Sequence, residues 1–171
     1  MKLITNGRMS RWKMNKYWFP TLFKKKRVEL GEGHVVAFTL FEWKYLFSII
    51  IYQWKTIKQN RFHSHAFPAW AFLLRGQYEE EVYTDKGIEK RVVNQWMKPR
   101  WLPRNYTHRI LQAAPKTWTI IFVGPWHDFW YEWFEEENVW VKYTWGRKVV
   151  EKKRQLKSLP WELLQNKEEI L

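Results

Sequence analysis

Short segments of β type, separated by turn residues, follow one another through most of this chain from residue 34 onward. They are rich in β-branched and aromatic residues, which favour strands. The segments are HVVAFTLFEW, YLFSIIIYQWKTI, FHSHAF, AWAFLLRG, QYEEEVYT, KRVVNQWM, HRILQA, TWTIIFVG and NVWVKYTW. Gly and Pro mark the breaks between them, and Asp85-Lys86-Gly87 has the composition of a hairpin turn. Many short strands at regular spacing predict an all-β sandwich or barrel.

A chain of 171 residues fits one domain with flanking segments. We expect a basic N-terminal extension over 1–33, irregular or loosely helical over 1–27, and a barrel over 34–145. A C-terminal tail over 146–171 is expected to contain a short helix, because SLPWELLQNKEEIL combines a Ser-Leu-Pro start with good helix formers.

Composition limits the possible metal ligands and the expected cellular location. Cysteine is absent, so a metal site would have to use histidine, carboxylate or water. The most hydrophobic stretch is interrupted by Glu42 and Lys44, which indicates two strands and no membrane span. The basic N-terminus is not followed by the apolar region of a signal peptide. We therefore expect a cytoplasmic protein without a membrane partner.

The net charge of +13 is unevenly distributed. Nine Lys and Arg residues and no acid lie between Met1 and Val28, interleaved with aromatic residues such as Trp12 and Trp18. Such an arm can contact the phosphates of a nucleic acid. A solvated arm whose aromatic side chains pack on the domain is the alternative, and charge alone does not decide between them.

Two of the five histidines, His63 and His65, are separated by one residue in FHSHAF. Side chains alternate faces along a strand, so both imidazoles project from the same face if the segment is extended. Two imidazoles on one face can converge on one metal ion. A His-x-His pair is weak evidence by itself, since paired surface histidines are common.

The residues that follow give the pair a context. Gly76 comes eleven positions after His65, and a second stretch reads Pro103-Arg104-Asn105-Tyr106-Thr107-His108. This order and spacing resemble the two motifs of the cupin superfamily, H-x-H…E…G and P-x-G-x-x-H. Asn105 stands at the motif's glycine, and Asn is the residue that next best tolerates a left-handed turn position.

The resemblance is strongest to small bacterial and phage cupin-like proteins and covers about residues 34–145. Its further pieces are Gly76-Gln77-Tyr78-Glu79-Glu80, His108-Arg109 and Trp118 to Pro125. It implies a jelly-roll (double-stranded β-helix) barrel. The chain departs from the pattern at Ala69, which occupies the slot of the usual glutamate ligand, and also at Ile57, Met97 and Gln112.

What remains of the family's metal site is a set of three histidines, His63, His65 and His108. The resemblance to three-histidine thiol dioxygenases makes Fe(II) the first expectation, with Zn, Ni or Cu as alternatives. A metal-free cupin that uses its cavity for binding alone stays open.

Two functions are compatible with these residues. The first is a non-haem metal enzyme acting on a small molecule, with Tyr78 or Tyr106 supplying a proton or hydrogen bond. Tyr78, Tyr106, Gln112 and Glu80 are candidates to orient the imidazoles. The second is a non-catalytic module that binds or sequesters an anionic, nucleotide-like molecule, as in a protein of phage origin. Its expected contacts are Trp70, Phe72, Arg75, Trp96, Trp101 and Arg104. Exposed aromatic strands also permit a homodimer.

Overall fold

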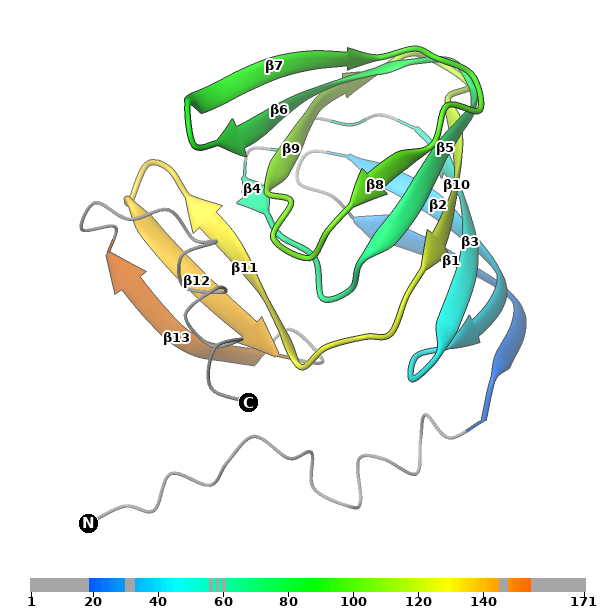
Figure 1. The fold of residues 1–171 in the computed structure, drawn as a ribbon, viewed down its shortest axis with the longest axis horizontal. Coiled ribbons are helices and arrows are strands. Elements are labelled where there is room, and N and C mark those ends of the chain that lie inside the picture. Colours follow the sequence, from blue (N-terminus) through cyan, green and yellow to red (C-terminus); the bar gives the residue numbers. More distant parts are fainter. Residues whose placement is uncertain are drawn as a thin grey trace.

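The chain folds into two antiparallel sheets that enclose a barrel (Figure 1). The computed structural model describes residues 19–29, 33–55, 57, 59, 61–144 and 148–154. The strands in these ranges are β1 (Thr21–Glu29), β2 (His34–Trp43), β3 (Phe47–Trp54), β4 (Phe62–His63), β5 (Ala69–Arg75), β6 (Tyr78–Thr84), β7 (Gly87–Val93), β8 (Arg100–Leu102), β9 (His108–Ala113), β10 (Trp118–Val123), β11 (Phe129–Phe134), β12 (Val139–Thr144) and β13 (Lys148–Arg154). These described residues contain no helix, and therefore no helix that could cross a membrane.

Eight of the strands, β3 to β10, form a jelly roll. They pair as a long hairpin rolled on itself: β3 with β10, β4 with β9, β5 with β8, and β6 with β7. The first sheet has the order β1-β2-β3-β10-β5-β8, and the second has β13-β12-β11-β4-β9-β6-β7. This nested order defines the two-sheet jelly roll. The predicted fold class is confirmed.

The alternation of side chains decides which residues enter the barrel. In β5, Ala69 and Ala71 are buried while Trp70 between them is exposed. In β6, Tyr78, Glu80 and Val82 are buried, and the residues between them are more exposed. Because the period is two, each strand gives one face to the interior and one to the outside.

The backbone conformation can be compared with the sequence motifs at three positions. Gly76 closes β5 with φ of +80°, and a Cβ there would lie 2.7 Å from the Cα of Thr117. Only glycine fits both requirements. Met97 replaces a motif glycine yet keeps a left-handed φ of 52°. Asn105 was expected at a left-handed position and does not adopt one, since it is not among the described residues with positive φ.

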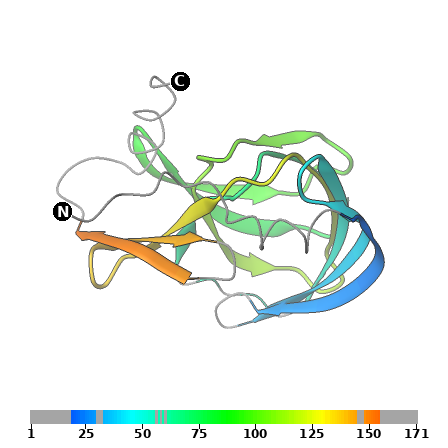
Figure 2. The ribbon, with the colours of Figure 1, turned by 90° about the horizontal axis from the view of Figure 1, so that it is seen from below.

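Strands also flank the predicted barrel range on both sides. Residues 21–27 were expected to be irregular or loosely helical, and this is wrong: they belong to β1, which pairs with β2 along its length. The strand β2 provides β1 with backbone hydrogen-bond partners, and the local composition of residues 21–29 does not reveal this pairing. After residue 145, β13 pairs with β12, and Figure 2 shows β1 and β13 at opposite ends of the molecule. The predicted C-terminal helix and the N-terminal residues 1–18 lie outside the described residues.

Candidate metal centre

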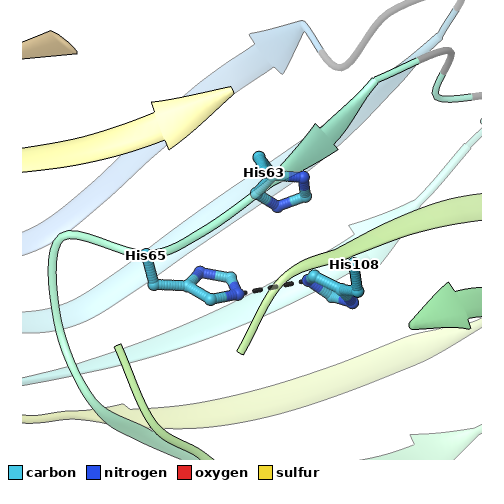
Figure 3. Close-up of side chains that lie close together, drawn as sticks. All are labelled: His63, His65 and His108. Carbon is cyan, nitrogen blue, oxygen red and sulfur yellow. Dashed lines mark hydrogen bonds between the residues drawn. The ribbon is translucent and has the colours of Figure 1, made fainter. Parts of the chain in front are cut away.

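The three histidines meet inside the barrel, at the junction of β4 and β9. His63 ends β4 and is directly opposite His108, the first residue of β9. His65 lies two residues beyond His63, past the end of the strand. Between them Ser64 points the other way, where its backbone N–H and its hydroxyl oxygen bond the backbone of Tyr131 at 2.9 Å. This anchoring to β11 turns both neighbouring imidazoles inward (Figure 3).

The rings face one another at close range. Their centroids are 5.2 Å apart for His63 and His65, 4.8 Å for His63 and His108, and 5.1 Å for His65 and His108. The Nε2 atoms of His65 and His108 are 3.1 Å apart, and one ring nitrogen from each of the three lies within 4.8 Å of the others. The sequence prediction that these three residues come together is confirmed in its geometry.

A buried carboxylate lies behind His108. The Oε2 atom of Glu80 is 2.9 Å from His108 Nδ1, and the Glu80 side chain is fully buried. An ionised carboxylate can only accept hydrogen bonds, so Nδ1 carries the proton. In the neutral ring Nε2 then has the lone pair, and it points toward His65.

Glu80 is held as an anion by further partners. Arg100 donates to its Oε1 atom, and the Tyr106 hydroxyl donates to the same oxygen at 2.9 Å. Arg100 also donates to the hydroxyls of Tyr106 and Tyr78. Burial alone would raise the pKa of Glu80, but the hydrogen bonds of His108 and Tyr106 and the charge of Arg100 lower it to about 2. The carboxylate therefore stays charged at neutral pH.

The environment of His65 favours its neutral form. Burial lowers its pKa well below the usual 6.5, and the neighbouring His108 and His63 lower it further. A neutral imidazole is the form that ligates metal. Two nitrogens bound to one ion at about 2.1 Å lie roughly 3.0–3.4 Å apart. The 3.1 Å spacing of the two Nε2 atoms fits a shared ion. Three imidazoles would leave coordination positions open for a small molecule.

The histidines form one end of a cavity of about 170 Å³ inside the barrel. Both sheets contribute to its wall. Besides the histidines, it is lined by Val28, Val35, Tyr52, Trp54, Gln59, Phe67, Ala69, Ala71, Tyr78, Leu102, Ile110, Thr119 and Ile121. Ala69, at the slot of the family's glutamate ligand, leaves an apolar surface there. The carboxylate near the site is Glu80, and it contacts the outer nitrogen of a histidine.

The two predicted tyrosines take different places. Tyr78 lines the cavity, whereas Tyr106 lies behind it and donates to Glu80. Burial raises the pKa of both hydroxyls, for Tyr106 to about 12 with a further contribution from Glu80. Both therefore stay protonated at neutral pH, so neither is a general base. Gln112 pairs its side chain with Glu79 on the outer side of β6, away from the histidines.

The predicted aromatic and cationic ligand contacts do not line this cavity. The reason is strand alternation, which buries Ala69 and Ala71 and turns Trp70 and Phe72 outward. Trp70, Trp96 and Trp101 are 46%, 74% and 48% exposed. None of them lines this cavity, and their role as contacts of an anionic ligand stays a prediction.

The two arginines of that prediction are placed elsewhere as well. Arg75 is exposed at the end of β5. The guanidinium of Arg104 lies 5.3 Å from the ring centre of Phe129. Neither belongs to the wall of the cavity.

Arg100 is the site residue that sequence reasoning missed, and Glu80 is the one it could not place. Both follow from alternation: Glu80 lies between Tyr78 and Val82 on the inward face of β6, and Arg100 shares the inward face of β8 with Leu102. A charged residue in register with buried apolar ones is the signal that could have found them.

No family model matches the chain, and no curated protein matches it in sequence. Solved structures are similar to it. KdgF from Halomonas sp. is 14% identical over 61% of this chain and 94% of its own, with a TM-score of 0.45. An RmlC-like cupin from Shewanella frigidimarina NCIMB 400 is 13% identical over 60% and 85%, with a TM-score of 0.44. A variant of Streptomyces PAC13 with uridine is 8% identical over 60% and 80%, with a TM-score of 0.45.

The chain has a cupin-type jelly-roll fold. The strand order of the eight central strands and the three histidines that face the barrel interior support this statement. The fold assigns no reaction, since one fold hosts many functions.

Proposed function

We propose that this cupin-fold chain binds a divalent transition metal through His63, His65 and His108 and acts on a small molecule at that site. Fe(II) is the first candidate, with a non-haem oxygenase reaction, and Zn, Ni or Cu are the alternatives. The observation that supports it best is the pair of Nε2 atoms 3.1 Å apart, one of them on a ring whose other nitrogen is held by Glu80. A histidine held by a carboxylate at its far nitrogen is a usual partner of a metal.

The bound metal would supply a Lewis acid with positions for a substrate atom and O₂ or water. The chain's own residues prepare that site. Glu80 fixes the ring plane and the tautomer of His108, while Arg100 and Tyr106 fix Glu80. Tyr78 is held by Arg100 and presents its ring to the cavity. Tyr106 is therefore a positioning residue, and it does not touch the substrate.

The second function, binding of a nucleotide-like anion without catalysis, receives no support from the cavity. Neither Lys nor Arg is among the residues that line it. Its volume of about 170 Å³ is also below the 300 Å³ or so at which pockets for drug-sized ligands begin. A nucleotide would meet neither enough space nor a cation.

Elemental analysis tests the proposal. Protein purified without a histidine tag is expected to contain close to one transition-metal ion per chain. His63→Ala and His108→Ala are expected to lose it, while His34→Ala, which changes a histidine on β2 outside the cluster, keeps it. Metal-free wild-type protein that does not take up any of the four metals would refute the proposal.

A further inference from the structure

The wall of the cavity is apolar beyond the histidine end. The residues that provide it from the two sheets include Val35, Ala71, Leu102, Ile110 and Ile121. Among the residues that the structure describes, no Asp, Glu, Lys or Arg lines it. Burying a charged group against such a wall without a partner is costly. A ligand that fills this space must therefore keep charge away from the wall.

Most polar groups of the wall are already used within the protein. The Trp54 Nε1–H donates to Thr119 Oγ1 at 2.9 Å, and Gln59 Oε1 accepts from the Ile110 backbone at 2.7 Å. The Tyr78 hydroxyl accepts from Arg100. Tyr52 adds a hydroxyl that stays protonated, because burial and the charge of Glu42 raise its pKa to about 12. The wall thus offers a ligand few hydrogen bonds and no charge.

The volume of the cavity indicates how much of a ligand it can hold. An apolar cavity of about 150 Å³ in another protein binds benzene. The present cavity is similar, at about 170 Å³. The part of a ligand that lies inside the cavity is therefore close in size to one six-membered ring.

We infer that the cavity takes a compact molecule of about six to ten non-hydrogen atoms, with an apolar, ring-sized body and its polar atoms confined to the end that meets the histidines. That this molecule is a substrate rests on the proposed function, because the metal would meet its polar atoms at the histidine end. The apolar wall and the volume alone define the body of the ligand.

Fluorine NMR on the full-length, EDTA-treated protein tests this with three probes that share one ring. Fluorobenzene is apolar, 4-fluorophenol has one hydroxyl, and 4-fluorobenzoate has a charge. We expect the first two to bind and the benzoate to bind at least about 10-fold more weakly, because in the metal-free protein its carboxylate meets no cation at the histidine end and none elsewhere in the wall. Uridine monophosphate is expected not to displace fluorobenzene. Benzoate binding as tight as that of fluorobenzene, or displacement by the nucleotide, would overturn the inference.

Substitutions that fill the cavity test whether fluorobenzene binds inside it. Ala71→Leu adds three carbon atoms to the wall and is expected to abolish fluorobenzene binding. Phe72→Leu, the neighbouring residue on the outer face of β5, is expected to leave it unchanged. Ala69→Val is a milder filling variant, should Ala71→Leu fail to fold by circular dichroism. Probe binding that survives filling of the cavity places the ligand elsewhere and contradicts the inference.

The outcome can be separated from that of the metal proposal. Fluorobenzene binding by a protein that takes up no metal would keep the ligand class and refute the metal function. Metal uptake without binding of any compact probe would refute the ligand class alone.

Discussion

Substitution of Glu80 by Gln changes the charge behind His108 and leaves the side-chain size unchanged. Glu80 is fully buried and is bonded to His108, Arg100 and Tyr106. Glutamine can still accept one hydrogen bond from His108. It cannot balance the charge of Arg100, whose side chain is only 21% exposed.

Two estimates give the loss of stability expected for Glu80→Gln. Breaking a buried ion pair by removal of one partner costs about 3–5 kcal/mol. Independently, the pKa of Glu80 is lowered from 4.5 to about 2, which corresponds to about 3 kcal/mol of stability at neutral pH. We expect Glu80→Gln to lower the free energy of unfolding by about 3 kcal/mol. Loss of the carboxylate behind a ligating histidine is expected to weaken metal binding about 10–100-fold.

Urea unfolding of the metal-free protein at pH 7 measures the first quantity, and isothermal titration with Co(II) measures the second. Glu79→Gln is the matched control. Glu79 is the next residue on the same strand, 26% exposed, and paired with Lys90 at 2.7 Å. A surface pair of this kind contributes at most about 1 kcal/mol, and the control should leave metal affinity unchanged.

The sign of the pH dependence gives a further check. Because the folded-state pKa of Glu80 is lowered, its stabilisation is present above pH 4.5 and is lost as the pH falls toward 2. The wild-type protein should lose this contribution in that range, and Glu80→Gln should not. Equal stability and equal metal affinity of the Glu80 and Glu79 variants would refute the role given to the carboxylate.

Three further outcomes are expected. Tyr106→Phe removes the hydroxyl that donates to Glu80, so it should cost about 1–2 kcal/mol in urea unfolding and change metal affinity less than about 3-fold; a larger metal effect would place Tyr106 at the ion. Gly76→Ala should cost more than about 2 kcal/mol, because φ is +80° and Thr117 also blocks a Cβ, whereas Gly87→Ala, which has the strain of its φ of +110° but open space around it, should cost less in the same assay. A homodimer stays a prediction, and Phe122→Lys, on the outer face of β10 beside exposed Trp70, should weaken a homodimer formed through this apolar face. Sedimentation at increasing concentration measures it with Val150→Lys on β13 as control, and a wild-type chain that is monomeric throughout would contradict it.

Much of the fold could be predicted because strands such as β2 and β9 carry their own β-type composition and clear turn signals. Their predicted ranges, 34–43 and 108–113, coincide with the observed strands. The strands β1, β8, β11 and β13 were missed. β1 carries four consecutive cations and depends on pairing with β2, and β8 has only three residues. Their strand character comes from tertiary pairing, which local propensity does not encode.

The histidine cluster could be predicted because its members follow motif spacing. The wall around it could not, because side-chain direction depends on strand register. Trp70 was expected to contact a ligand, but its neighbours Ala69 and Ala71 line the cavity while Trp70 faces outward. The sequence drew attention to Ala69 in the slot of the acidic ligand. The structure shows that the carboxylate beside the histidines is Glu80, on β6 of the other sheet, which contacts the outer nitrogen of His108.

Titration of the EDTA-treated wild-type protein with Co(II), followed by its visible absorption, tests the central claim most directly. One equivalent of Co(II) per chain is predicted, with absorption bands of nitrogen coordination that vanish in His65→Ala and His108→Ala and persist in His34→Ala. A wild-type protein that does not saturate with Co(II), or variants of His65 and His108 that bind it as tightly as the wild type, would contradict the three-histidine metal site.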